Sequence, residues 1–378
     1  MRLDNLITFN VIKENYSNSH LEDVYLLGCQ HILDSTLLLV EQLIKIGLKK
    51  DNISLIGKCY STSNYIYRKF IDYGIYVCNS SKKFHTTGSF DRAFNKNVAC
   101  FVEKEIKNFF KSGAKNLVIV DDGAEIIQYF NKHYSFENNK DVKIIAVEQT
   151  TAGTNKLKNT DLKFPVVNIA RSRAKLTLES PIIARRVIDI LEKEIEKKQL
   201  FVKKILIIGM GAIGEALYNL LKVKYIVSGY DIKSRENNLN QSKIINLIKD
   251  YDLIIGCTGT ELFDPLLLTG FKKQITLVSA SSSDREFMSY KLKILQGKYK
   301  KDSRKSIVYN NVTILNGGYP INFDGKKNNI PIDKIQITLA LLAAGICQID
   351  NELNKGFNDL PLNIENQIMD LFDTVTKV

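Results

Sequence analysis

Residues 204–231, KILIIGMGAIGEALYNLLKVKYIVSGYD, decide the fold of this chain. An apolar run leads into a G-x-G-x-x-G that begins at Gly209, and helical spacing of apolar residues continues to Leu221. A second apolar run, Tyr225 to Gly229, is followed by Asp231. The order strand, glycine turn, helix, strand and acid is typical of a dinucleotide-binding βαβ unit.

Each position of the glycine turn has a mechanical reason. Gly209 permits the tight turn, Gly211 lets a pyrophosphate approach the backbone, and Gly214 lets the helix pack closely. Ala212 and Ile213 open the helix, whose free N–H groups and positive dipole favour phosphate. We therefore expect these five residues to hold the phosphates of a dinucleotide.

The acid at the end of the second strand selects the cofactor. Asp231 lies 17 residues after Gly214 (231 − 214), where a carboxylate accepts hydrogen bonds from both ribose hydroxyls. The same carboxylate would repel a 2′-phosphate, so the sequence predicts NAD and not NADP. The alternative is a glycine turn in some other α/β sheet.

Composition indicates a globular cytoplasmic protein. The chain has 378 residues, 44% of them hydrophobic and 25% charged, which is enough for two or three domains. No apolar run reaches the roughly 18 residues that span a bilayer, and the N-terminus lacks a signal-peptide layout. The six cysteines form no CxxC, which favours reduced thiols and argues against a metal site.

The net charge of +12 raises the possibility of nucleic-acid binding. The lysines are spread along the whole chain, there is no tryptophan, and no basic stripe carries interleaved aromatic residues. We therefore expect no nucleic-acid partner, and an anionic small molecule accounts for the charge.

Apolar runs and helical spacing alternate on both sides of the βαβ unit. Before it we expect strands at 24–28, 53–57, 76–78, 116–120, 142–147 and 165–169, and helices at 32–46, 62–72, 97–110 and 181–198. After it we expect a helix at 241–249, strands at 253–257, 275–279 and 312–315, and helices at 335–349 and 362–374. This alternation predicts an α/β fold of two Rossmann-like parallel-sheet domains with C-terminal helices.

The same pattern predicts the domain bounds. Residues 1–180 would form a substrate domain that begins with a short polar leader over residues 1–20. Residues 181–334 would form the NAD-binding domain, with the helix at 181–198 as the hinge. Residues 335–378 would be helices that pack back on the substrate domain.

Polar residues stand where the predicted strands of the first domain end, which is where open α/β sheets bind ligands. They are His31, Asp121, Asp122, Glu148, Gln149, Thr150, Thr151 and Asn168. Lys175 and Glu179 follow at i and i+4, so one helix face would carry both, and a lysine held by a carboxylate could move a proton. Three alternatives stay open: an ordinary surface ion pair for Lys175–Glu179, a turn carboxylate or a metal ligand for Asp121–Asp122, and a surface or capping histidine for His31.

Taken in order, the motifs resemble S-adenosylhomocysteine hydrolase over roughly residues 21 to 372. The matching segments are Cys29–Thr36, Ser61–Ser63, Asp121–Glu125, Glu148–Gly153, Asn168–Ser180, the glycine turn, Thr258-Gly259 and Asn316-Gly317. In that family, bound NAD⁺ transiently oxidises the ribose 3′-hydroxyl, which acidifies the C4′–H and lets the thiol leave.

The resemblance implies a role for each matching residue. Lys175 with Glu179 would assist the 3′ oxidation, Asp122 would sit at the C4′ proton, and His31 would serve elimination and water addition. The substrate would be bound by Thr62, Gln149 and Thr150. Besides the five residues of the glycine turn and Asp231, the cofactor would be bound by Thr150, Thr151, Thr258, Gly259 and Asn316.

The chain also departs from the family pattern. Gln149 replaces a glutamate, and a glutamine keeps hydrogen bonds but takes no proton. Leu33 and Ser35 replace the residues that read the adenine edge, Ser180 replaces an asparagine, and Tyr319 replaces a histidine. The family's C-terminal tail is missing, which favours a homodimer through the cofactor domain over a tetramer.

Several functions follow from these observations. The leading one is reversible thioether cleavage of S-adenosylhomocysteine or a related nucleoside. The alternatives are a related NAD enzyme that oxidises a sugar hydroxyl of a different nucleoside, and an NAD-binding protein without hydrolase activity. A 2-hydroxyacid dehydrogenase shares this architecture, but the sequence lacks that family's Arg and Glu–His set in its usual order. In each enzymatic case we expect a small-molecule substrate and no membrane partner.

Overall fold

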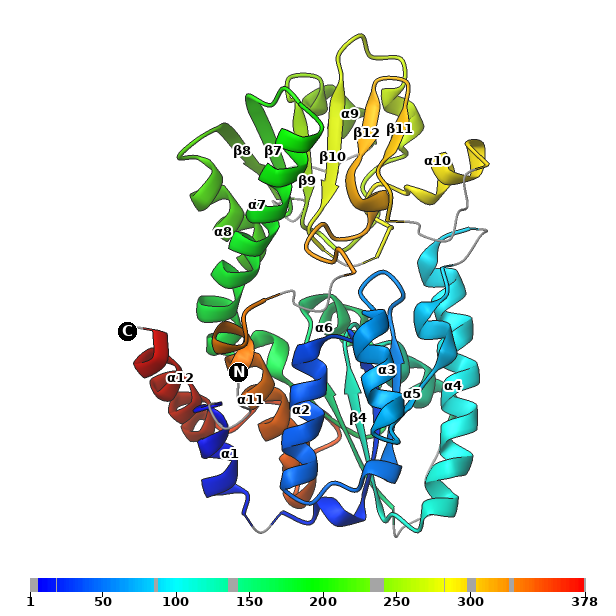
Figure 1. Cartoon of the computed structure of the whole chain (residues 1–378), viewed down its shortest axis with the longest axis vertical. Helices are drawn as coiled ribbons and strands as arrows, with labels where there is room; N and C mark the ends of the chain where they lie inside the picture. Colours follow the sequence, from blue (N-terminus) through cyan, green and yellow to red (C-terminus); the bar gives the residue numbers. More distant parts are fainter. Residues whose placement is uncertain are drawn as a thin grey trace. The chain divides into compact units, whose positions relative to one another are not determined.

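The computed structural model describes residues 6–17, 19–84, 88–134, 142–231, 241–281, 283–297, 304–325 and 330–376. Its contacts divide the chain into two compact units (Figure 1). Unit 1 comprises Met1–Lys83, Asn95–Glu179 and Ile330–Val378, and unit 2 comprises Phe84–Phe94 and Ser180–Asn329. Both are α/β units built on largely parallel sheets, so the predicted fold class is confirmed.

Unit 1 is built on a parallel sheet with strand order β13-β6-β5-β4-β1-β2-β3. Its strands are β1 (Val24–Gln30), β2 (Ile53–Gly57), β3 (Tyr76–Val77), β4 (Asn116–Asp121), β5 (Lys143–Glu148), β6 (Pro165–Asn168) and β13 (Gly356–Asn358). Its helices are α1 (Phe9–Asn15), α2 (Asp34–Lys45), α3 (Asn64–Asp72), α4 (Phe90–Ser112, in unit 1 from Asn95 onward), α5 (Glu125–His133), α6 (Thr151–Leu157), α11 (Ile332–Cys347) and α12 (Leu362–Thr376). The strand order reverses between β1 and β4, so the carboxyl ends of these two strands form a topological switch point.

Residues 6–17 do not form part of the polar leader that the sequence predicts over residues 1–20. Helix α1 packs against α11 and α12, and Phe9, Val11 and Ile12 are buried there. These apolar residues lie at helical spacing, and their burial outweighs the polar residues around them.

Helix α11 returns the chain to the core of unit 1. It packs against α2, β4 and β5, and nearly all of its side chains from Gln336 onward are buried. In the described part of the chain, the segment Ile332–Asp350 alone is long and apolar enough to cross a membrane, and 78% of its apolar window is buried inside the protein. Its apolar character is therefore accounted for by the core.

Unit 2 holds a sheet with strand order β11-β12-β10-β9-β7-β8. Its strands are β7 (Lys204–Ile208), β8 (Ile226–Tyr230), β9 (Leu253–Gly256), β10 (Ile275–Ser279), β11 (Ile307–Tyr309) and β12 (Val312–Ile314), and its helices are α7 (Ser180–Lys197), α8 (Ala212–Leu221), α9 (Gln241–Ile248) and α10 (Tyr290–Leu295). All strand pairs are parallel except β11 with β12. The strand order reverses between β7 and β9, which gives this unit its own switch point.

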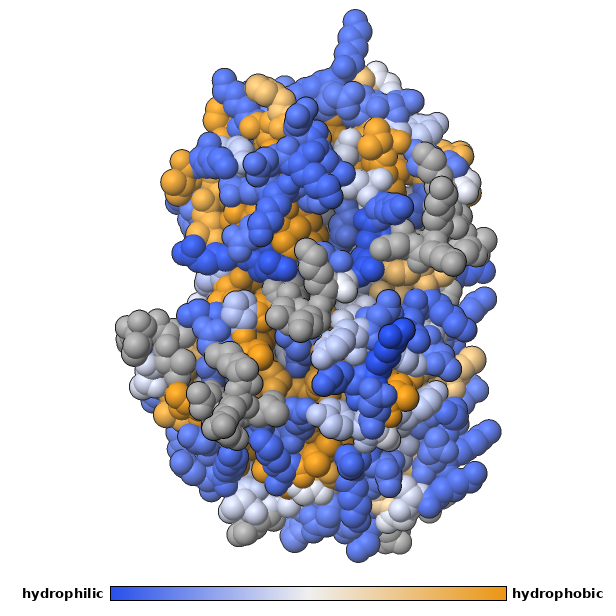
Figure 2. Space-filling model, viewed as in Figure 1, coloured by the Kyte–Doolittle hydropathy of each residue, from blue (hydrophilic) through white to orange (hydrophobic). Residues whose placement is uncertain are grey.

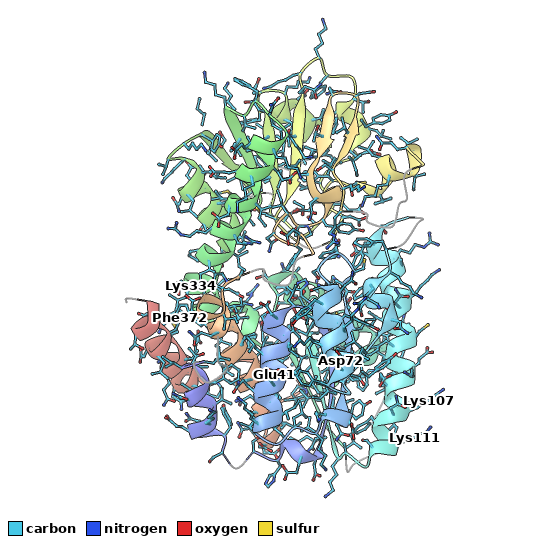
Figure 3. The ribbon with its side chains drawn as sticks, in the orientation of Figure 1. Glu41, Asp72, Lys107, Lys111, Lys334 and Phe372 are labelled. Atoms are coloured by element: carbon cyan, nitrogen blue, oxygen red, sulfur yellow. The ribbon has the colours of Figure 1, made fainter. Side chains whose placement is uncertain are left out.

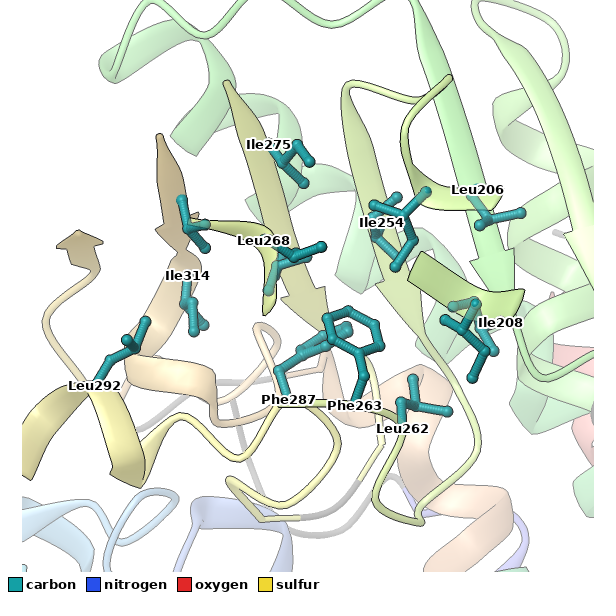
Figure 4. Packing of buried hydrophobic residues seen from close by; sticks show 14 of the residues in the cluster. Leu206, Ile208, Ile254, Leu262, Phe263, Leu268, Ile275, Phe287, Leu292 and Ile314 are labelled. Atoms are coloured by element: carbon teal, nitrogen blue, oxygen red, sulfur yellow. The ribbon is translucent and has the colours of Figure 1, made fainter. Parts of the chain in front are cut away.

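One face of this sheet is closed by a packed aliphatic and aromatic cluster (Figure 4). At its centre the rings of Phe263 and Phe287 lie 5.5 Å apart at 57°. The cluster joins the loop after β9 to the segment before α10. It therefore fixes the carboxyl ends of the strands beside the glycine turn.

Residues 84–94 lie inside the predicted substrate domain, yet they group with unit 2. Arg285 explains this, since its Nε and Nη2 both bond the Asp91 carboxylate at 2.8 Å. The Phe90 backbone N–H also donates to Asp284 at 3.2 Å. A bidentate arginine–carboxylate pair forms between residues far apart in sequence, so local patterning carries no signal for it.

The displayed faces of both units are mainly hydrophilic, with hydrophobic atoms in small groups (Figure 2). Lys107 and Lys111, one turn apart on α4, are exposed and point outward (Figure 3).

Candidate functional site

The glycine turn of unit 2 has the geometry that its three glycines require. Gly209 has φ +101°, and a Cβ there would lie 2.8 Å from the backbone carbon of Cys257. A Cβ on Gly214 would lie 2.0 Å from the carbonyl oxygen of Gly209, so α8 packs directly on the turn. A Cβ on Gly211 would meet nothing within 4 Å, so this backbone is open to a ligand.

Asp231 lies beside this turn. Strand β8 pairs with β7 so that Tyr230 faces Ile208, and the N–H of Gly209 donates to the Tyr230 carbonyl at 2.7 Å. Asp231 is the next residue and is partly buried. The acid and the glycine turn therefore stand at neighbouring strand ends, the arrangement that dinucleotide recognition requires.

The loop after β9 completes the switch point of unit 2 and is held by Glu286. This buried carboxylate accepts hydrogen bonds from the N–H groups of Thr258 (2.6 Å) and Gly259 (3.1 Å) and from the hydroxyl of Ser279 (2.7 Å). Burial raises the pKa of Glu286, and these donors oppose the rise. Thr258 and Gly259 thus have a fixed backbone beside the glycine turn.

The Asn316 side chain is held by hydrogen bonds within its own loop. It adopts a left-handed conformation (φ 49°), and its Nδ2 donates to the carbonyls of Pro320 at 2.8 Å and Phe323 at 3.1 Å. If Asn316 contacts a cofactor amide, its Oδ1 is the atom that does so.

Gly211→Ala tests whether a ligand approaches this turn. The free energy of unfolding should stay within about 0.5 kcal/mol of wild type, because the new methyl group meets nothing. Affinity for NAD should fall at least about tenfold, because the methyl group lies where the pyrophosphate would approach. Denaturant unfolding and calorimetric titration measure the two quantities. An unchanged NAD affinity would contradict a phosphate site at Gly211.

At the switch point of unit 1, side chains from three strand ends converge on Asp122. The Lys58 Nζ bonds Asp122 Oδ1, and the Gln149 Nε2 donates to Asp122 Oδ2 at 2.5 Å. His31 Nε2 lies 3.4 Å from the same Oδ2. The loops are tied together by backbone bonds from Asp122 to Cys29 (3.0 Å) and from Gln149 to Asp121 (3.2 Å).

The protonation states in this cluster follow from its burial and charge. Burial alone would raise the pKa of Asp122, but Lys58 and His31 outweigh it and hold this pKa well below its usual range. Burial lowers the pKa of His31 to about 4, with Asp122 opposing this shift and Lys58 adding to it. Burial also opposes the charge of Lys58, yet Asp122 keeps the lysine pKa well above its ordinary value.

His31 should make the protein less stable in acid. Its pKa is about 4 in the folded state, whereas an ordinary histidine titrates at about 6.5, so the unfolded chain binds more protons between these limits and stability falls as pH falls. From pH 7 to pH 5 this linkage costs about 2 kcal/mol. Denaturant unfolding of wild type and His31→Gln at both pH values measures the difference, which separates His31 from the carboxylates. Equal pH dependence in the two proteins would contradict a depressed His31 pKa.

A second carboxylate, Glu148, braces the loops behind this cluster. It accepts bonds from the N–H groups of Ala124 (2.8 Å) and Thr150 (2.7 Å) and from the Thr150 hydroxyl (2.7 Å). Burial is the main cause that raises the pKa of Glu148 to about 8 and that of Asp121 to about 6. A Cβ on Gly153 would lie 2.3 Å from the Glu148 carboxyl carbon, so only glycine fits there.

The threonines predicted to bind substrate or cofactor have structural bonds. Thr150 caps α6, because its hydroxyl oxygen accepts from the Gly153 N–H at 2.9 Å. The same hydroxyl donates to Glu148 at 2.7 Å. The Thr62 hydroxyl donates to the Lys58 carbonyl at 3.0 Å. Thr151, the first residue of α6, is exposed. Thr62 and Thr150 thus shape the site, whereas Thr151 presents its side chain to solvent.

Lys175 and Glu179 form the predicted pair. The Lys175 Nζ lies 2.8 Å from Glu179 Oε2, and the two side chains are only 12% and 13% exposed. They lie on the π-helical segment Lys175–Glu179, a distortion that is frequent at functional sites. Thr338 of α11 donates to Glu179 Oε1 at 2.6 Å. The pair is therefore oriented and largely shielded, unlike an ordinary surface ion pair.

Sequence reasoning missed Lys58, Thr338 and Glu286. Lys58 directly follows a predicted strand, and this position is the signal that could have found it. Thr338 and Glu286 gave no such signal, because their partners are distant in sequence. In the described residues, no three His, Cys, Asp or Glu side chains are grouped so that they could hold a metal ion.

These observations define an α/β protein with two switch points, one carrying a dinucleotide-type glycine turn and the other a cluster of buried ionisable groups. No family model matches the chain. It is 34% identical over 336 residues to two uncharacterized proteins of Mycobacterium tuberculosis, Rv0104 and MT0113. These matches cover 86% of this chain, and the chain spans 64% of the length of each relative.

Several solved structures share parts of the fold at low identity. NAD⁺-bound 3-phosphoglycerate dehydrogenase of Entamoeba histolytica is 13% identical with a TM-score of 0.43, over 88% of this chain and 99% of that one. D-lactate dehydrogenase of Escherichia coli is 11% identical with a TM-score of 0.37, over 86% and 96%. Structural similarity at this level does not indicate the cofactor or substrate of this chain. The resemblance to S-adenosylhomocysteine hydrolase rests on sequence motifs alone.

Proposed function

We propose that the chain is an NAD-dependent oxidoreductase that acts on a secondary hydroxyl of a small polar molecule, with the sugar ring of a nucleoside as the leading substrate class. The observation that carries this proposal is the shielded Lys175–Glu179 pair with its Thr338 donor. A lysine held in this way is suited to hydrogen-bond a hydroxyl as it loses its proton.

The glycine turn supports NAD as the cofactor. Gly211 leaves room for a pyrophosphate, and Asp231 follows the strand beside the turn, where it would accept from the ribose hydroxyls. When bound, NAD⁺ supplies a hydride acceptor. Thr258 and Gly259, fixed by Glu286, would form a further wall of the cofactor site.

The chain's own residues would manage the substrate's proton. The Lys175 ammonium would hydrogen-bond the hydroxyl oxygen, pass one of its own protons to Glu179 and take up the O–H proton in its place. Glu179 would keep the ammonium in place, and Thr338 would keep the carboxylate in place. In the reverse direction Lys175 would donate a proton to the carbonyl oxygen as it is reduced.

Hydrolysis of S-adenosylhomocysteine is the second candidate, supported by the order of the sequence motifs. It also requires removal of the C4′ proton, a role that the resemblance gives to Asp122. That carboxylate is bound by Lys58 and Gln149 and has a pKa well below its usual range, which makes it a weak base. This observation favours redox chemistry over elimination.

A single assay separates these functions. Purified protein is incubated with NAD⁺ and, separately, with adenosine, inosine and S-adenosylhomocysteine, and both NADH absorbance and free thiol are followed. NADH formation without thiol release supports the oxidoreductase, and thiol release from S-adenosylhomocysteine supports the hydrolase. Binding of NAD without either signal from any nucleoside would overturn the proposal in favour of an NAD-binding protein without turnover.

A further inference from the structure

We propose that Lys58 is a positioning residue that fixes where the proton resides in the His31–Asp122 pair. It keeps Asp122 a carboxylate and His31 a neutral imidazole at neutral pH, so His31, and not Asp122, is the group that accepts a proton at this switch point. The proton distribution is a property of the protein alone, whereas its use on a substrate rests on the proposed function.

The placement of Lys58 is built into the fold. The residue directly follows β2 and is 3% exposed. Its carbonyl accepts from the hydroxyls of Ser61 at 3.1 Å and Thr62 at 3.0 Å, which closes the turn and directs the side chain toward Asp122. The ammonium then bonds Asp122 Oδ1.

Charge balance determines the state of His31. Lys58 and Asp122 are buried and together carry no net charge. A proton on His31, 3.4 Å from Asp122, would leave one uncompensated positive charge in this cluster. Because an unpaired buried charge costs several kcal/mol, the imidazole stays neutral while Lys58 is in place.

Ser61 and Asp122 lie next to the two ring nitrogens of His31. The Ser61 hydroxyl is 2.5 Å from His31 Nδ1 and 3.1 Å from the Lys58 carbonyl. On the other side of the ring, Nε2 is 3.4 Å from Asp122 Oδ2. A substrate proton passed to the neutral imidazole would form an imidazolium that Asp122 stabilises.

The other titratable groups around His31 leave this assignment unchanged. Cys29 on β1 is buried, and burial holds its pKa well above its ordinary value, so it stays neutral. Asp121 accepts from the N–H groups of Ile126 (2.7 Å) and Ile127 (2.9 Å), and Glu125 bonds Lys156 at 2.5 Å. Tyr60, whose ring centre lies 6.2 Å from that of His31, and Glu148, held by the loops behind, complete the surroundings. Among them, Lys58 is the cation that contacts Asp122 directly.

Proton NMR of the four histidines tests this proposal in the protein without NAD or substrate. The His31 signal is assigned by its loss in His31→Gln and titrated from about pH 4 to pH 8. Wild-type His31 should protonate more than one pH unit below the ordinary histidine value. In Lys58→Met its pKa should rise by more than one unit, because His31 becomes the partner of Asp122. Lys58→Arg, which keeps the charge, and Lys115→Met, which removes a surface ion pair, should leave the His31 pKa low.

A wild-type His31 that titrates at or above the ordinary value would overturn the proposal, as would an unchanged value in Lys58→Met. Should Lys58→Met fail to fold, the double variant Lys58→Met/Asp122→Asn restores neutrality. There His31 should again titrate low, because only burial remains, and a high value would count against the proposal. The NMR result does not depend on turnover, so its failure is distinguishable from a failed NADH assay.

Discussion

Replacing Lys175 by methionine should lower the rate of NADH formation by about 10²- to 10⁴-fold, the usual contribution of a positioned acid–base group. The substrate hydroxyl would lose its hydrogen-bond donor, and Glu179 would keep only its Thr338 bond. Affinity for NAD should stay within about threefold of wild type, because Lys175 lies in unit 1 and the glycine turn lies in unit 2. Single-turnover kinetics with the nucleoside found active in the assay above, together with calorimetric NAD binding, measure both quantities.

The matched control is Lys115→Met. Lys115 also pairs with a carboxylate, Asp23, at 3.6 Å, but the pair is largely exposed, with the lysine side chain 74% exposed. Its removal should leave the rate within about twofold of wild type, since exposed pairs contribute little. Wild-type rates in Lys175→Met would remove the lysine from the mechanism.

Gly214→Ala should strongly destabilise unit 2. The added Cβ would lie 2.0 Å from the Gly209 carbonyl oxygen, which is backbone and has no rotamer to adopt. The start of α8 must move away from the turn, at a cost of about 3 kcal/mol in the free energy of unfolding. Because the helix N-terminus moves with it, NAD affinity should fall by at least about 100-fold.

Gly211→Ala is the control for this variant, because it adds the same methyl group to the same turn where a Cβ meets nothing within 4 Å. Loss of NAD affinity without loss of stability is expected for Gly211→Ala, and loss of both for Gly214→Ala. A fully stable Gly214→Ala would contradict the close contact between α8 and the turn.

The fold was largely predictable because its signals are local. Strand ends, helical spacing and the glycine turn each lie within a short stretch, and the structure has these elements with bounds shifted by a few residues. Helix α4 is the larger exception, running over Phe90–Ser112 where 97–110 is predicted. Helices α5, α6 and α10 and strands β11 and β13 were not predicted. Apart from α5, each is a short element of at most seven residues, which gives a pattern little room to repeat.

The chemistry of the site was less predictable because it depends on contacts between distant residues. Lys58 and Asp122 are 64 positions apart, and Thr338 and Glu179 are 159 apart. The strand order brings each pair together, and the sequence gives no measure of that order. The predicted roles of His31, Asp122, Lys175 and Glu179, and the predicted homodimer, remain predictions.

The edge strand β13 has a consequence for synthesis on the ribosome. Its residues Gly356–Asn358 pair with β6 at Pro165–Val167, so unit 1 lacks an edge strand, and its core helix α11, until unit 2 has been translated. The stretch 180–329 can emerge and collapse while unit 1 still exposes the apolar face that α11 will cover. Nascent chains arrested before α11 should therefore be protease-sensitive in unit 1 and good clients for chaperones, and release past residue 358 should remove both properties.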